Sequence, residues 1–251
     1  MKKMNDTDKE KRKFLLEHTS EAQSLMSHGK KDEALACYDK ILDEYPDELS
    51  ALYGKGMIYY EFNDFSDALK CFDKVLAIDP NDVNSLYAKG SVLRIIGQPS
   101  EAMVAIDKVI ELESKFAIAY LAKGYILMDL KKYDEALTSF SKVEEMGREQ
   151  SVLAGKGYCY LMLGKEKEAI DHFERALKID PYDPEALFGL GQYEYQMKNW
   201  KQAHRYLHRC VVQDDDNIDA WVMLADIFKN TNQTEEEKIA LDKVKELEKK
   251  N

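Results

Sequence analysis

Residues 51–60, ALYGKGMIYY, place two glycines, Gly54 and Gly56, inside a run that otherwise favours a helix. Glycine within a helix costs about 1 kcal/mol relative to alanine, so its presence there calls for a reason. The triplet Gly-Lys-Gly is also found in phosphate-binding loops, but such a loop requires GxxxxGK[ST] directly after a strand. This stretch has neither the spacing nor the strand. We therefore expect the glycines to be packing contacts.

The second of these glycines marks a repeat along the chain. Further glycines follow it at intervals of 34, 34, 33 and 34 residues, and an alanine recurs in step. The marker glycines are Gly56, Gly90, Gly124, Gly157 and Gly191, and the alanines are Ala34, Ala68, Ala102, Ala136, Ala169 and Ala203. A bulky residue comes four positions after each alanine. A fixed period of this length indicates a repeat architecture.

Each repeat predicts two packed helices. Leu52, Gly56 and Tyr59 share one helical stripe, and Ala68 and Phe72 share another. The short segment 62–65 between them makes the two helices antiparallel. We expect the small residues to let the backbones approach, while Tyr59 and Phe72 fill the space beside them.

The segments LYGKG, LYAKG, YLAKG and LAGKG, with DALKCFDKVLAIDP and EAIDHFERALKIDP, resemble the tetratricopeptide repeat over residues 15–247. The lysine before the marker glycine resembles the KG signature of prokaryotic members. The resemblance implies an all-α, right-handed α-α superhelix of about seven helix-turn-helix units. The expected units are 15–48, 49–82, 83–116, 117–149, 150–183, 184–217 and 218–251, after a charged extension at 1–14. The last unit is expected to be a C-terminal cap, and residues 15–251 one domain.

Three local features carry expectations of their own. The charged extension either frays or lengthens the first helix. Unit four is one residue short, so we expect the stack to change curvature between units four and five. Thr234 with Glu237 predicts a capping box at the start of the final helix.

The resemblance also implies a concave groove along the first helix of each pair. With the marker glycine at repeat position 8, we call positions 2, 5, 9 and 12 the inner stripe, and position 6 adjoins it. Position 6 is small and positions 5 and 9 are rich in aromatic residues, which suits apolar side chains of a ligand. Arg94 is expected to anchor an acidic ligand residue. The predicted groove residues are Tyr53, Gly54, Met57, Tyr87, Ala88, Arg94, Ala122, Tyr125, Gly155, Tyr158, Phe188 and Gln192. The alternative is that these aromatics pack only against neighbouring helices.

One ligand class of the resembled family is not expected. Its clamp for chaperone C-terminal carboxylates uses lysine, arginine and asparagine at set inner positions. The matching positions here hold Thr19, Gln23, Gly54, Asn84 and Ala88, which offer no convergent cationic donors.

Composition restricts the remaining classes of partner. Thirty-six basic and 47 acidic residues give a net charge of −11, which argues against nucleic acid. No apolar run approaches a membrane span, and the first residues lack a signal-peptide core, so we expect a cytoplasmic protein that does not enter membranes. The four cysteines form no CxxC pair, and no cofactor is expected.

No catalytic set of residues is evident, so the chain is predicted not to be an enzyme. His204 and His208 lie four apart, but two ligands alone rarely hold zinc, and no metal site is predicted. We expect a non-enzymatic protein–protein interaction scaffold that binds an apolar or aromatic-containing peptide or helix. The alternatives are a homo-oligomer or assembly factor acting through its terminal units, and a metal protein using the two histidines.

Overall fold

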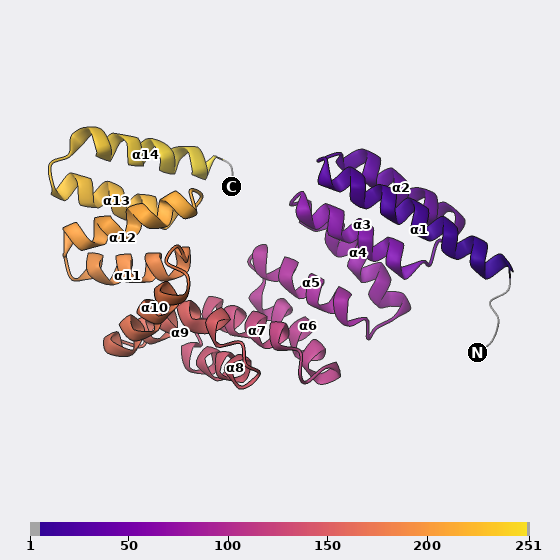
Figure 1. Ribbon diagram of the computed structural model, residues 1–251, viewed down its shortest axis with the longest axis horizontal. Coiled ribbons are helices and arrows are strands. Elements are labelled where there is room, and N and C mark those ends of the chain that lie inside the picture. Colours follow the sequence, from indigo (N-terminus) through magenta and orange to yellow (C-terminus); the bar gives the residue numbers. More distant parts are fainter. Residues whose placement is uncertain (1–5, 250–251) are drawn as a thin grey trace. The chain divides into compact units, whose positions relative to one another are not determined.

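The computed structural model describes residues 6–249. They form α-helices and one 3₁₀ helix, and this part of the chain contains no strand. The residues group into two compact units, up to Ala122 and from Lys123 onward. The helices follow one another in the antiparallel pairs expected from the repeat, and Figure 1 shows the pairs within each unit.

Unit 1 contains three complete helix pairs and the start of a fourth. These are α1 (Asp6–Ser27) with α2 (Lys31–Glu44), α3 (Leu49–Glu61) with α4 (Phe65–Ile78), α5 (Val83–Ile95) with α6 (Pro99–Leu112), and the first residues of α7 (Ala117–Asp129). Residues 6–14 of the charged extension belong to α1, so this part lengthens the first helix. Residues 1–5 lie outside the described part of the chain.

Unit 2 contains the rest of α7 and the remaining helices. These are α8 (Tyr133–Glu145), the 3₁₀ helix η1 (Glu149–Val152), α9 (Leu153–Met162), α10 (Glu166–Ile179), α11 (Pro184–Gln196), α12 (Trp200–Gln213), α13 (Ile218–Asn230) and α14 (Thr234–Glu248). The 3₁₀ helix η1 lies at the junction between the fourth repeat, which is one residue short, and the fifth; the other repeat junctions in the described residues contain no such helix.

The turn inside each helix pair contains one residue in the left-handed region. These residues are Gly29, Asn63, Gly97, Lys131, Gly164, Lys198 and Asn232, with φ between 59° and 76°. They recur with the repeat, because every pair needs the same sharp reversal. Glycine and asparagine adopt this conformation readily, whereas it is sterically unfavourable for lysine.

The marker glycines lie against the bulky residue that follows sixteen positions later. A Cβ atom at Gly124 would come within 2.7 Å of three Phe140 ring atoms, and one at Gly157 would lie 2.7 Å from the Phe173 ring. The same contact joins Gly56 to Phe72 at 2.6 Å. These rings are fully buried. The glycines are therefore packing contacts, as predicted, although the bulky residue rather than the partner alanine fills the space opposite.

The final helix begins differently from the expected capping box. Gln233 is its N-cap residue, and no side chain caps the helix there. Thr234 is already the first helical residue, whereas a capping threonine must stay outside the helical conformation. The predicted capping box is wrong.

Candidate functional site

A pocket of about 460 Å³ lies between α1 and α3, the first helices of two successive pairs in unit 1. Three predicted groove residues of α3 line it together: Tyr53, Gly54 and Met57. The α1 side supplies residues at the matching inner positions. The full lining is Thr19, Gln23, Met26, Tyr38, Ser50, Tyr53, Gly54, Met57, Ile58 and Glu61. Apolar and polar groups are mixed, and one carboxylate lies at the edge.

Gly54 was expected to form the floor of the groove itself, but in this pocket it makes room for another side chain that forms the floor. A Cβ atom at Gly54 would come within 2.6 Å of three atoms of Tyr38. The glycine therefore makes room for the Tyr38 side chain of α2, which is 6% exposed and itself lines the pocket. Burial raises the pKa of Tyr38, so its hydroxyl stays protonated. The floor is a tyrosine ring rather than open space.

Two other small residues expected to form the groove floor are buried. Ala88 and Gly155 are inaccessible, and a Cβ atom at Gly155 would lie 2.9 Å from the Phe140 ring. Position 6 therefore receives the bulky residue of the preceding helix pair. At these two residues the small side chain makes room for packing between repeats. Ala122 is half-buried at the end of unit 1.

The four predicted groove tyrosines are half-buried, and each packs against a neighbouring ring. Ring centroids lie 5.8 Å apart for Tyr53 and Phe72, 6.0 Å for Tyr87 and Phe116, 5.5 Å for Tyr125 and Phe140, and 6.3 Å for Tyr158 and Tyr133. The first pair is tilted and the other three are edge-on, and contacts of this kind fix ring orientation. One side of each ring thus belongs to the core, while part of it stays accessible.

The remaining predicted residues occupy varied surroundings. Arg94 is half-buried in the last turn of α5. Phe188 packs against the core formed by α12 and α13. Gln192 is half-buried, and its Oε1 atom is shielded from solvent without a hydrogen-bond donor among the described residues.

The inner face of unit 2 curves around α9. The Tyr125 hydroxyl of α7 donates a hydrogen bond to Glu185 Oε2 of α11 at 3.0 Å. Packed helix axes lie about 8–10 Å apart, so a direct bond between helices on either side of α9 requires this face to bend inward. The consecutive inner helices α11 and α13 are also joined by a tyrosine–carboxylate hydrogen bond, in which Tyr195 Oη donates to Asp226 Oδ2 at 2.7 Å. This bond, together with burial, raises the pKa of Tyr195.

The lysines before the marker glycines make ion pairs between repeats. Lys55 pairs with Asp39, and Lys89 Nζ lies 2.6 Å from Asp73 Oδ1, both sixteen residues earlier. These pairs were not predicted from the sequence. The signal that could have revealed them is an acidic residue sixteen positions before Lys55, Lys89 and Lys123, which is replaced by Phe140 before Lys156.

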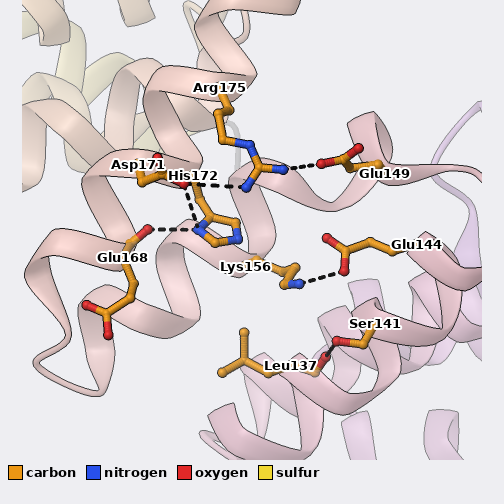
Figure 2. Close-up of polar contacts among 9 residues, drawn as sticks. All are labelled: Leu137, Ser141, Glu144, Glu149, Lys156, Glu168, Asp171, His172 and Arg175. Atoms are coloured by element: carbon orange, nitrogen blue, oxygen red, sulfur yellow. Dashed lines mark hydrogen bonds and ion pairs between the residues drawn. The ribbon is translucent and has the colours of Figure 1, made fainter.

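At the irregular junction of unit four the ion pairs change partners, as Figure 2 shows. Lys156 of α9 is 7% exposed and lies 2.8 Å from Glu144 of α8. Arg175 of α10 pairs with Glu149 of η1 and lies 3.4 Å from Asp171 on its own helix. These contacts hold η1 between two helix pairs.

Two other pockets, one larger than the pocket between α1 and α3 and one of similar volume, are lined by none of the predicted groove residues. One of about 760 Å³ is found where α11, α12 and α13 meet, with Trp200, His204 and Phe228 in its wall. Another of about 470 Å³ lies over α4, α5 and α6, beside the exposed Val104.

The two histidines of α12, His204 and His208, lie side by side. Their ring centroids are 5.7 Å apart, and His204 also contacts the Phe228 ring edge-on. Among the residues described here, no group of three or more potential ligands comes together. All four cysteines are buried and unpaired.

Comparison with known proteins identifies the repeat. Sequence models described as tetratricopeptide repeat match residues 19–83, 151–183, 184–227 and 218–251. A tetratricopeptide repeat protein from Parabacteroides merdae superposes with a TM-score of 0.81 over 94% of this chain and 93% of that one, at 15% identity. The chain is a tetratricopeptide repeat protein. Its all-α fold is that of the repeat family, as the sequence predicted.

Other similarities cover smaller parts of this repeat protein. A model described as anaphase-promoting complex, cyclosome, subunit 3, matches residues 61–143. The tetratricopeptide repeat-containing protein trd-1 of Caenorhabditis elegans is 32% identical over 65 residues, which is 26% of this chain and 8% of that relative. The structure of YrrB, described as a repeat protein with an unusual peptide-binding site, matches with a TM-score of 0.58 and 27% identity, covering 68% of this chain and 88% of that one.

None of the helices described is both long enough and apolar enough to cross a lipid bilayer.

Proposed function

We propose that this repeat protein is a non-enzymatic, cytoplasmic scaffold whose inner stripe binds an apolar or aromatic-containing segment of a partner protein. The observation that carries the proposal is the pocket between α1 and α3, which brings Tyr53, Gly54 and Met57 together over the Tyr38 ring. Its volume of about 460 Å³ is large enough for one or two bulky side chains. The predicted single repeat domain, 15–251, remains part of this proposal.

The chemistry of the pocket suits side chains rather than a charged small molecule. Methionine adapts its shape to an apolar partner, and half-buried tyrosine offers a ring face together with a hydroxyl. Thr19, Gln23 and Ser50 at the border can hydrogen-bond to the backbone of a bound segment. Membership of the repeat family supports a protein ligand, and the peptide-binding site of YrrB is found on a similar fold.

A phage-displayed library of random 12-residue peptides provides the test. We expect the wild-type chain to select peptides with bulky apolar or aromatic residues, and Met57→Asp to lose their binding. Ala77→Asp is the matched control, because it adds the same charge on an exposed position of α4, outside the pocket. Circular dichroism should show both variants folded. Failure to select any peptide, or equal binding by both variants, would refute the proposal.

Self-association is a second candidate, favoured by apolar side chains on the terminal helix. Ile239 and Leu241 of α14 are 65% and 41% exposed. If copies of the chain assemble through this helix, light scattering should show a mass that rises with concentration and falls in an Ile239→Glu variant. A mass equal to one chain at all concentrations would dismiss this candidate.

A further inference from the structure

The inner stripe differs in charge between the two units. In residues 15–122 the positions of this stripe contain no carboxylate and one basic residue, Arg94. In residues 123–249 the same positions contain three carboxylates, Glu185, Asp219 and Asp226, and one basic residue, Lys229. Any segment that lies on the inner face of unit 2 therefore meets negative charge.

These carboxylates share their face with the groove tyrosines. Glu185 and Asp226 accept hydrogen bonds from the hydroxyls of Tyr125 and Tyr195. Burial raises the pKa of Tyr158, and the nearby charge of Asp219, 61 residues further along the chain, acts in the same direction. Tyr158 and Asp219 occupy the same repeat positions, 9 and 2 of repeats two apart, as the hydrogen-bonded Tyr125 and Glu185, so the repeat places Asp219 on the Tyr158 side of this face. Its carboxylate is exposed and makes no hydrogen bond or ion pair with the residues that the structure describes.

A buried acceptor without a donor lies in the same row. Tyr158, Gln192 and Asp226 occupy repeat position 9 of α9, α11 and α13, and α11 contacts both other helices. Gln192 Oε1 has no hydrogen-bond partner among the described residues. An unsatisfied buried carbonyl oxygen is unfavourable, so a ligand that brings donors to this row is stabilised by the hydrogen bond it supplies.

We propose that the inner face of unit 2 binds a basic segment of a partner protein, with an arginine or lysine side chain seated beside Tyr158 and Asp219. This inference rests on the proposed function and specifies the partner's chemistry. A guanidinium can stack on a tyrosine ring while its N–H groups pair with a carboxylate and an amide oxygen. Arginine has a complementary group for each of these three features. The chain's charge of −11 also favours a basic ligand, whereas phosphate would be repelled.

The peptide library also tests this inference. We expect the wild-type chain to enrich arginine and lysine, and selected basic peptides to bind about tenfold more weakly to a Glu185→Gln/Asp219→Asn variant. The matched control is Glu168→Gln/Glu174→Gln, which removes the same charge from exposed positions of α10. Binding of the basic peptides should also weaken as sodium chloride rises from 50 to 300 mM.

The outcomes separate this inference from the proposed function. If the selected peptides are apolar without basic enrichment, and Met57→Asp alone removes their binding, the scaffold function stands and the basic-ligand inference is wrong. If basic peptides bind the Glu185→Gln/Asp219→Asn variant as well as they bind the control, the inference is also wrong. If no peptide is selected, both fail.

Discussion

Replacing Gly124 by alanine tests the packing of the repeat at a place where the structure leaves little room. The new Cβ atom would come within 2.7 Å of three Phe140 ring atoms, closer than real Cβ contacts. The ring cannot move aside easily, because it is fully buried and Gly155 lies against its other part. Overpacking of this kind costs about 1–3 kcal/mol.

Alanine also favours the helix by about 1 kcal/mol over glycine, so the clash must exceed that gain to be visible. Because three ring atoms clash at once, we take the upper part of that range and expect a net loss of about 1–2 kcal/mol for Gly124→Ala. Gly90→Ala is the matched control. There the nearest atoms are the Cδ1 and Cγ1 atoms of Ile106 at 2.9 Å, so the clash is milder than at Gly124. Its net change should be about zero.

Urea unfolding followed by circular dichroism measures both variants. Phe140→Leu removes the ring that the new Cβ atom at position 124 meets. The losses of unfolding free energy from Gly124→Ala and Phe140→Leu should therefore be non-additive by about 1 kcal/mol in the double variant. The reasoning is refuted if Gly124→Ala is as stable as the wild type, or if the two changes add without coupling.

Four further outcomes are expected. Lys131→Gly should stabilise the chain by about 0.5–1 kcal/mol in urea unfolding, because Lys131 has φ 59°; a loss of stability would contradict the turn geometry. Lys156→Ala should cost about 1–2 kcal/mol, since Glu144 is left partly buried without its partner, and Lys156→Met should cost nearly as much because it removes the same charge; wild-type stability in Lys156→Met would disprove a charge effect. Burial raises the pKa of Cys159 to about 12, so native thiols should resist iodoacetamide at pH 8 and react after unfolding; rapid native labelling would refute this burial. Burial, then a neighbouring histidine, lowers the pKa of His204, so stability should fall as pH drops below about 6.5, less so in His204→Gln; identical pH profiles would refute this.

The repeat could be predicted from the sequence because its period is a packing requirement. Every repeat has a small residue at the position of Gly124 and a bulky residue at the position of Phe140. The contact between these two positions lies within one helix pair. The helix pairs, their turns and the buried stripe all follow from that spacing. The family comparisons confirm the repeat.

The contacts between repeats were harder to predict. Gly155 was expected to line the groove, but the Phe140 ring of the preceding pair fills that space. A period shows that a position is small without showing which neighbour needs it to be small. The same holds for the ion pair between Lys89 and Asp73, which joins successive repeats.

The candidate site was predictable in part. Tyr53 and Met57 lie in one pocket because both belong to the inner stripe of α3. The floor of that pocket comes from Tyr38 on another helix, which no pattern within one repeat could reveal. The Tyr125–Glu185 hydrogen bond depends on how far the inner face of unit 2 bends. The repeat period alone does not predict that curvature.

A crystal structure of the chain with a peptide selected from the library tests the central claim most directly. The account predicts a bulky peptide side chain between α1 and α3, in contact with Tyr53 and Met57. A peptide bound instead against the second helices of the pairs, or at the turns between helices, would contradict it.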